Sequence, residues 1–181
     1  DADEAAGVTH AHELGRAGAV CHALAIAHVL QLADRESVDV TSLLAELLRC
    51  PQVHEAFAAK LQQVGELVEQ RASPRQAAHV LGNGVLAEEA VPLALFAFLR
   101  WAPNFEDIVK NTILAGGDTD TTAAMSGSLG GALVGDDGLP VSWLDRLEQG
   151  AKGRSHVEHL ADAVFDLRSR HAREACSLVT P

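Results

Sequence analysis

The chain has 181 residues, which is enough for one domain with a buried core. Its 48% hydrophobic and 22% charged residues are typical of a soluble globular protein and exclude wholesale disorder. A formal net charge of −11 and a pI near 5.1 argue against nucleic-acid binding, because binding to a phosphate backbone depends on clusters of Lys and Arg.

Hydrophobic periodicity predicts helices along nearly the whole chain. From Leu14 to Leu32, apolar residues recur at three- and four-residue steps, which is typical of a helix with one buried face. Ser73-Pro74-Arg75-Gln76 combines an N-cap, a proline at the first helical position and a capping-box glutamine. Ser155-His156-Val157-Glu158 repeats the capping box without the proline. Further helices are expected at 42–48, 53–70, 88–101, 105–114, 121–134, 141–149 and 156–171.

Glycine-containing segments separate these helices. Gly82-Asn83-Gly84 and Gly135-Asp136-Asp137-Gly138 are predicted to be turns, because glycine accepts positive φ. No segment has the β-branched content of a strand, and neither an internal repeat nor a Pro/Ser-rich linker is visible. The sequence therefore predicts an all-α fold, a compact helical bundle in which residues 1–181 belong to one domain.

The cysteines and the apolar segments bear on the cellular setting. Three cysteines at no motif spacing argue against a disulfide framework and favour a reducing, intracellular setting. The apolar stretches are interrupted well short of the roughly 20 residues that a membrane-spanning helix needs. The chain begins with Asp1 and has no signal-peptide pattern, so we expect a fragment, or a numbering that starts inside a longer protein.

The acidic turn, residues 116–121 with the sequence Gly-Gly-Asp-Thr-Asp-Thr, carries the clearest functional signal. The side-chain oxygens of Asp118, Asp120 and Thr121 lie close together in sequence and form a hard, anionic site of the kind that Mg²⁺, Ca²⁺ or Mn²⁺ prefers. One turn offers only about half of an octahedral shell. Waters and a substrate, or another part of the protein, must therefore complete it.

Three other interpretations of this turn were weighed. An EF-hand loop counted from Asp118 needs a carboxylate at its twelfth position, where Leu129 stands. An Asp-x-Asp-x-Thr phosphatase signature fits residues 118–122 literally, but it belongs at the end of a strand in a parallel sheet. Asp118 could also simply cap a helix, which leaves Asp120 and the glycine pair unexplained.

The helix expected after the turn carries a stripe of small residues. Ala124, Gly127 or Ser128, and Gly131 recur at three- and four-residue steps. We expect this stripe to let a neighbouring backbone approach closely, which would make the helix central to its bundle.

Three segments together resemble the ADP-ribosylglycohydrolase family. The acidic turn and the small-residue helix after it resemble the family's metal motif. Val8-Thr9-His10-Ala11-His12 is similar to its Thr-His segment, and Leu81-Gly82-Asn83-Gly84-Val85 is similar to its Gly-Asn-Gly segment. The Gly-Asn-Gly segment, together with the helix after it, is most similar to the ADP-ribosylserine hydrolase branch.

The resemblance implies an orthogonal all-α bundle that hydrolyses the bond between C1″ of ADP-ribose and its acceptor, with two Mg²⁺ ions in the site. The implied acceptor is serine, with poly-ADP-ribose and O-acetyl-ADP-ribose as alternatives. By matching positions, Asp118, Asp120 and Thr121 would be metal ligands. His10 would contact ADP-ribose at its diphosphate, and Val85 would line the pocket.

The sequence departs from the family's pattern in one large respect. Family members carry an amino-terminal half with a Thr-Asp-Asp metal segment, an acidic catalytic residue and a glycine-rich diphosphate loop, and this sequence contains none of them. The chain is similar to the carboxy-terminal half, so no catalytic residue is assigned to it. We expect it to be inactive by itself and to require the missing amino-terminal half, in the same or a second chain.

Several further residues have competing interpretations. His10-x-His12 could be a zinc pair, but it lacks a third ligand. Glu88 and Glu89 could supply a catalytic carboxylate, although a helix-start position favours acidic residues without any function. The whole chain could also be a non-catalytic relative, either an ADP-ribose-binding pseudoenzyme or a structural protein, a reuse that the family shows in crystallins.

The resemblance also implies partners and a location. The partner is ADP-ribose or an ADP-ribosylated protein, with no direct nucleic-acid or membrane contact. In a eukaryote the implied setting is the DNA damage response, in the nucleus and cytoplasm, with the mitochondrion as an alternative.

Overall fold

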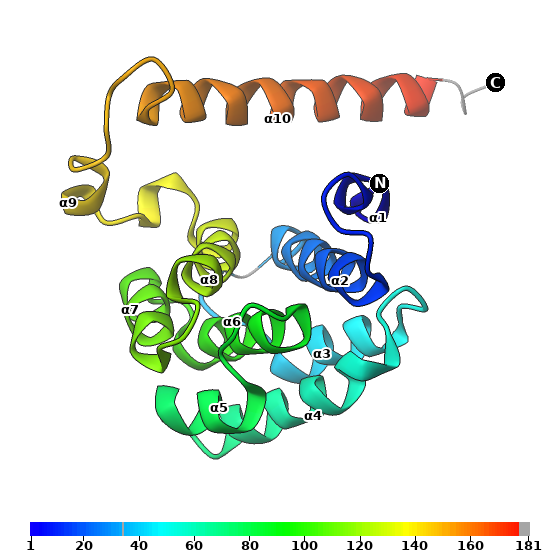
Figure 1. Ribbon diagram of the computed structural model, residues 1–181. Coiled ribbons are helices and arrows are strands. Elements are labelled where there is room, and N and C mark those ends of the chain that lie inside the picture. Colours follow the sequence, from blue (N-terminus) through cyan, green and yellow to red (C-terminus); the bar gives the residue numbers. More distant parts are fainter. Residues whose placement is uncertain (34, 178–181) are drawn as a thin grey trace. The chain divides into compact units, whose positions relative to one another are not determined.

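The computed structural model describes residues 1–33 and 35–177, with side chains as far as residue 170 (Figure 1). The chain divides into two compact units, Asp1–Leu139 and Pro140–Pro181, and each is described by itself. The assignment of residues 1–181 to one domain stays a prediction.

Both units are built from helices and loops. The first unit contains α1 (Ala2–Gly7), α2 (Glu13–Leu30), α3 (Val40–Arg49), α4 (Glu55–Glu69), α5 (Pro74–Leu81), α6 (Ala87–Trp101), α7 (Phe105–Ala115), α8 (Thr119–Val134) and the short 3₁₀-helix η1 (Asp136–Gly138). The second contains α9 (Val141–Leu144) and α10 (Arg154–Ser177). Residues 1–33 and 35–177 form no strand, so the all-α prediction is confirmed. A phosphatase signature, which needs a strand before Asp118, is excluded.

Helix α6 is the centre of the first unit. Its residues from Ala90 to Leu99 are all buried, as expected for a helix that is apolar on every side. It packs against α2, α4, α5, α7 and α8, and Figure 1 shows it in green among them. The chain segments that carry the acidic turn and the Gly-Asn-Gly loop therefore flank one buried helix.

Local sequence signals set most of the helix starts. The capping box of α5 is confirmed, because the Ser73 hydroxyl accepts the Gln76 N–H and the Gln76 side chain accepts the Ser73 N–H. Asp39 and Asn104 cap α3 and α7 with their side chains. His12 does the same for α2.

The sequence prediction was wrong in three places near the chain ends. Helix α1 was not expected, and the second capping box is wrong because α10 begins at Arg154, before Ser155. The helix expected at 141–149 ends at Leu144. The carbonyl of Glu148 instead accepts the Arg154 N–H at 2.9 Å, so the chain turns back where a helix was predicted to continue.

Helix α8 is central, as expected, but its buried face is not the predicted stripe. It packs against α2, α6 and α7. Its buried residues are Thr122, Ser126, Leu129, Gly130 and Leu133, whereas Ala124 and Ser128 of the stripe are exposed. The close approach occurs at Gly130, where an added Cβ would lie 3.1 Å from Cδ2 of Phe105.

In the part of the chain that the structure describes, no helix is both long enough and apolar enough to cross a membrane.

The crossing of α2 and α6 depends on Gly18. A Cβ at Gly18 would lie 2.9 Å from Cβ of Ala87, whereas a Cβ at Gly127, in the interior of α8, would meet Cγ2 of Val109 at an ordinary 3.6 Å. Gly18→Ala is expected to lower the free energy of unfolding, since overpacking costs about 1–3 kcal/mol and the gain in helix propensity is only about 0.5–1 kcal/mol. Gly127→Ala should gain propensity without the clash. Urea unfolding followed by circular dichroism compares the two, and equal effects would contradict the tight crossing.

Candidate metal and ligand site

Asp118 stands at the N-cap position of α8, but its carboxylate does not cap the helix. Its side chain makes no capping hydrogen bond. The backbone carbonyl of Asp118 accepts the Thr122 N–H at 3.1 Å and the Thr122 hydroxyl at 2.7 Å. Helix capping therefore does not account for the Asp118 side chain.

The Asp120 carboxyl group lies beside that of Asp118 on the same turn. The pKa of Asp120 is lowered, chiefly by a side-chain hydrogen bond with Asp118 and also by hydrogen bonds from the backbone N–H groups of Thr121 and Asp120. Asp118 is half-buried, while Asp120 and Thr121 are exposed. The turn therefore presents an ionised carboxylate and two further oxygen donors to a ligand from outside.

This donor set fits Mg²⁺ as part of a coordination shell. Carboxylate and hydroxyl oxygens are the ligands that hard cations prefer, and octahedral coordination needs about six of them. The turn offers side chains from three residues, Asp118, Asp120 and Thr121. Among the described residues, no group of three or more His, Cys, Asp and Glu side chains could hold a metal ion without other ligands.

The glycine pair before Asp118 makes room for the Gly-Asn-Gly loop. Gly116 and Gly117 have φ values of 75° and 78°. A Cβ at Gly117 would lie only 1.9 Å from the carbonyl oxygen of Asn83. That oxygen accepts the Asp118 N–H at 2.8 Å, and Nδ2 of Asn83 donates to the Ala115 carbonyl at 3.1 Å. Asn83 therefore binds the backbone on both sides of the glycine pair.

The structure brings the acidic turn and the segment of Val85 together. Val85 follows the Gly-Asn-Gly loop directly, and its side chain is 80% exposed. The assignment of Val85 to a binding pocket stays a prediction.

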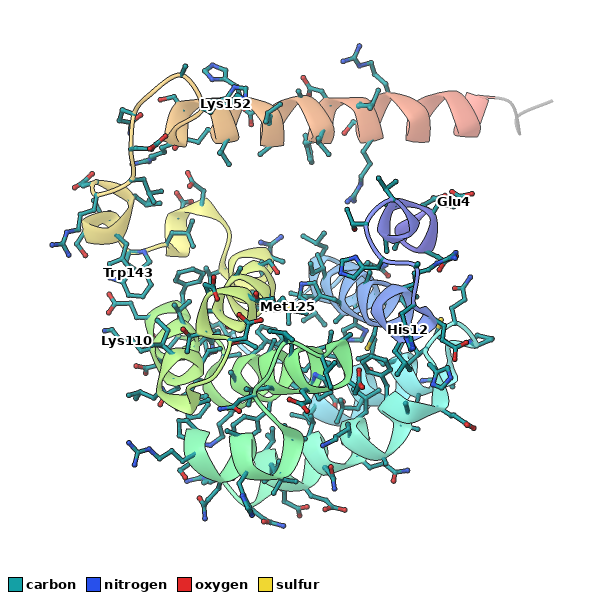
Figure 2. All side chains as sticks on the ribbon, viewed as in Figure 1. Glu4, His12, Lys110, Met125, Trp143 and Lys152 are labelled. Atoms are coloured by element: carbon teal, nitrogen blue, oxygen red, sulfur yellow. The ribbon has the colours of Figure 1, made fainter. Side chains whose placement is uncertain are left out.

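His10 is not linked to the turn by any contact within the described residues. It is exposed, its Nδ1 lies 2.8 Å from the Thr9 hydroxyl, and its ring packs over Gly15, where a Cβ would be 3.1 Å from Cδ2 of His10. The neighbouring His12 stands at the start of α2 (Figure 2), and its Nδ1 accepts the Leu14 N–H at 3.2 Å. Since that nitrogen serves as a helix cap, the geometry argues against a zinc pair at His10 and His12.

A hollow on the first unit lies away from the acidic turn. A groove of about 530 Å³ between α3 and α4 is lined mostly by apolar side chains, among them Val40, Leu44, Leu61 and Val68. None of the predicted site residues lines it. Its apolar character suits neither a metal ion nor a diphosphate.

The residue that sequence reasoning missed is Asn83. The sequence indicated only that it occupies a turn between two glycines. Its amide and carbonyl groups instead join two segments that are 32 positions apart. The available signal was the pairing of two glycine-rich segments, since closely approaching backbones need residues without a side chain.

The contact between the two loops yields a matched pair of variants. Gly116 and Gly117 both have positive φ, so alanine at either position is strained by about 1–3 kcal/mol. Only at Gly117 does the new Cβ meet the Asn83 carbonyl, because the nearest atom to a Cβ at Gly116 is 3.7 Å away. We expect Gly117→Ala to remove the hydrogen-exchange protection of the Asp118 amide and Gly116→Ala to retain most of it. Equal protection in both variants, measured by NMR, would contradict the contact.

Comparison with known proteins shows the family to which the sequence is similar. The family model for ADP-ribosylglycohydrolase matches residues 1–174. ADP-ribosylhydrolase ARH3 of Homo sapiens is 31% identical over 183 residues, covering 87% of this chain and 49% of the human protein. An uncharacterized protein of Archaeoglobus fulgidus is 31% identical over 171 residues, covering 93% of this chain and 51% of that protein.

A third relative matches over a shorter stretch. The ADP-ribosyl-[dinitrogen reductase] glycohydrolase of Rhodospirillum rubrum is 36% identical over 63 residues, which is 35% of this chain. The chain spans about half the length of the human and archaeal relatives. The all-α fold and the family match over nearly the whole sequence lead to one conclusion: the chain belongs to the ADP-ribosylglycohydrolase family.

Proposed function

We propose that this chain takes part in the Mg²⁺-dependent hydrolysis of the glycosidic bond between ADP-ribose and an acceptor, with Asp118, Asp120 and Thr121 as metal ligands. The family relationship supports a hydrolase of ADP-ribosyl groups. The observation that carries the metal assignment is the Asp118 carboxylate, which stands at a helix N-cap without capping it and lies beside Asp120.

Each part of the site has a separate task in this proposal. Mg²⁺ held by Asp118, Asp120 and Thr121 would orient the distal ribose hydroxyls and C1″ and would activate a water molecule for attack. Asp118 and Asp120 bind the metal ion, and Asn83 fixes the backbone that carries these two residues. Val85 lines the pocket, and His10 contacts the diphosphate of ADP-ribose.

The proposed acceptor is serine, with poly-ADP-ribose and O-acetyl-ADP-ribose as alternatives. This choice follows the similarity of the Gly-Asn-Gly segment to the ADP-ribosylserine hydrolase branch and the match to ADP-ribosylhydrolase ARH3. An acceptor joined through a protein side chain makes an ADP-ribosylated protein the partner. The intracellular location and the link to DNA damage stay predictions.

The described residues supply only part of a two-metal site. Three ligand residues on one turn fill about half of one octahedral shell, and Mg²⁺ binds weakly when its geometry is incomplete. We propose that the remaining ligands and the catalytic acid or base come from a further polypeptide segment. The match to about half the length of its relatives is consistent with this division.

The alternative is a non-catalytic relative that binds ADP-ribose or serves as a structural protein. A structural protein does not need two acidic side chains side by side on one turn. It would gain stability from an aspartate that caps its helix. The Asp118 carboxylate does not cap α8, and this favours a ligand site over a purely structural role.

Asparagine substitutions test the metal assignment. Asp118→Asn and Asp120→Asn in the complete protein are each expected to weaken Mg²⁺-dependent ADP-ribose binding by more than the roughly 10–100-fold that changes to outer-shell groups cost. Isothermal titration calorimetry with ADP-ribose, with and without Mg²⁺, measures this. Asp137→Asn, an exposed position in η1, is the control for the loss of one charge. Binding that survives both site variants would refute the metal site.

Activity of the chain alone tests the division of the site. Residues 1–181 by themselves are expected to release no ADP-ribose from a serine-linked ADP-ribosyl peptide, at any Mg²⁺ concentration, because the shell is incomplete. Chromatography of the reaction mixture against a protein-free control measures the release. Measurable Mg²⁺-dependent release by these residues alone would show that they contain a complete site.

A further inference from the structure

We propose that Glu89 is a positioning residue whose carboxylate fixes the Gly-Asn-Gly loop, residues 82–84, so that Asn83 can hold the acidic turn. Glu89 lies in the first turn of α6 and contacts none of the three proposed metal ligands within the described residues. It therefore acts through the loop. The consequence for metal and ligand binding rests on the proposed function, whereas the effect on the backbone does not.

The Glu89 carboxylate occupies the space beside the two glycines of the loop. Its Oε2 accepts the Gly84 N–H at 2.8 Å. A Cβ at Gly82 would lie 2.5 Å from Cδ of Glu89, and a Cβ at Gly84 would lie 2.8 Å from Oε2. A side chain at either glycine would have to displace the Glu89 carboxylate from the Gly84 N–H, so the loop and Glu89 fit together only with small residues at these positions.

The other end of the loop is fixed by a second charged side chain. Nζ of Lys60, from α4, donates to the carbonyls of Val80 and Leu81 at 2.9 Å each. These are the last carbonyls of α5, which a helix leaves without partners. Lys60 thus fixes the chain as it enters the loop, and Glu89 fixes it as it leaves. Asn83, between the two, is held in one place.

Asn83 connects the fixed loop to the acidic turn by two hydrogen bonds. Its carbonyl accepts the Asp118 N–H at 2.8 Å, and its amide donates to the Ala115 carbonyl at 3.1 Å. Loss of the hydrogen bond from Gly84 to Glu89 would free the loop and, with it, the acceptor of the Asp118 N–H. Metal ligands need support of this kind, because misplacement of ligands lowers affinity.

The residues after Glu89 form a rigid platform. Ala90 and Val91 follow it in α6 and are 4% and 2% exposed, so the backbone that carries Glu89 is anchored in the core. An acidic residue in a first turn also interacts favourably with the helix dipole. Glu88 shares that position in the first turn but makes no hydrogen bond to the loop in the described part of the chain. A comparison of variants at Glu88 and Glu89 therefore separates the effect of the loop contact from the effect of the helix dipole.

Hydrogen exchange tests the positioning role without any metal or ligand. Glu89→Ala is expected to raise the exchange rate of the Gly84 and Asp118 amides in the complete protein at unchanged global stability, measured by NMR and by thermal unfolding. Glu89→Gln keeps an acceptor oxygen at the same reach, so it should restore the protection. Glu88→Ala should leave both amides protected. If Asp118 stays protected in Glu89→Ala, the proposal is overturned.

Calorimetry with Mg²⁺ and ADP-ribose then tests the consequence for the site. Glu89→Ala should weaken Mg²⁺-dependent ADP-ribose binding by about 10–100-fold, as for other outer-shell groups, and Glu89→Gln should not. If the wild-type protein shows no such binding while the exchange pattern appears, the proposed function fails and the positioning role stands. If wild-type binding is present and neither variant changes exchange or affinity, the positioning role fails and the proposed function stands.

Discussion

The contact between the Asn83 carbonyl and the backbone at Gly117 is the constraint on which the site depends. The oxygen lies where a side chain at position 117 would begin, so only glycine permits the contact. The Asp118 N–H donates to the same oxygen. The N–H groups that a capping Asp118 would accept, those of Asp120 and Thr121, are instead hydrogen-bonded to the Asp120 carboxyl group. The Asn83 contact therefore fixes the backbone of Asp118, and Asp120 takes over the first-turn N–H groups that Asp118 does not cap.

Electrostatics explains why a cation belongs at this turn. The chain carries a formal net charge of −11, and ADP-ribose carries two phosphate groups, so direct binding of the nucleotide is opposed by repulsion. The two adjacent carboxylates add to that repulsion unless a metal ion neutralises them. One Mg²⁺ ion would cancel the two carboxylate charges, and the second ion of the proposed two-metal site would make the local charge positive. The acidic composition, which argues against nucleic-acid binding, is thus compatible with an anionic ligand that is bound through metal.

The features that the sequence predicted are those that depend on residues close together in the chain. The capping box at Ser73, the all-α class and the hard-cation character of Asp118, Asp120 and Thr121 are local patterns. The fold class was confirmed by the structure, and the metal remains a proposal.

Contacts between distant segments could not be predicted from one sequence. The link from Asn83 to Ala115 joins residues 32 positions apart, and Glu89 had been weighed only as a catalyst or a helix-start charge. The buried face of α8 was misassigned because Gly130, outside the predicted stripe, makes the closer approach to Phe105.

The most direct test of the central claim is a crystal structure of the complete protein with ADP-ribose and Mn²⁺, whose anomalous scattering locates the ion. We expect an anomalous peak within about 2–2.5 Å of carboxylate oxygens of Asp118 and Asp120, with the Asn83 contact to Asp118 unchanged. A structure that contains ADP-ribose and ordered Mn²⁺ elsewhere, with the Asp118 carboxylate turned back to cap α8, would contradict the account.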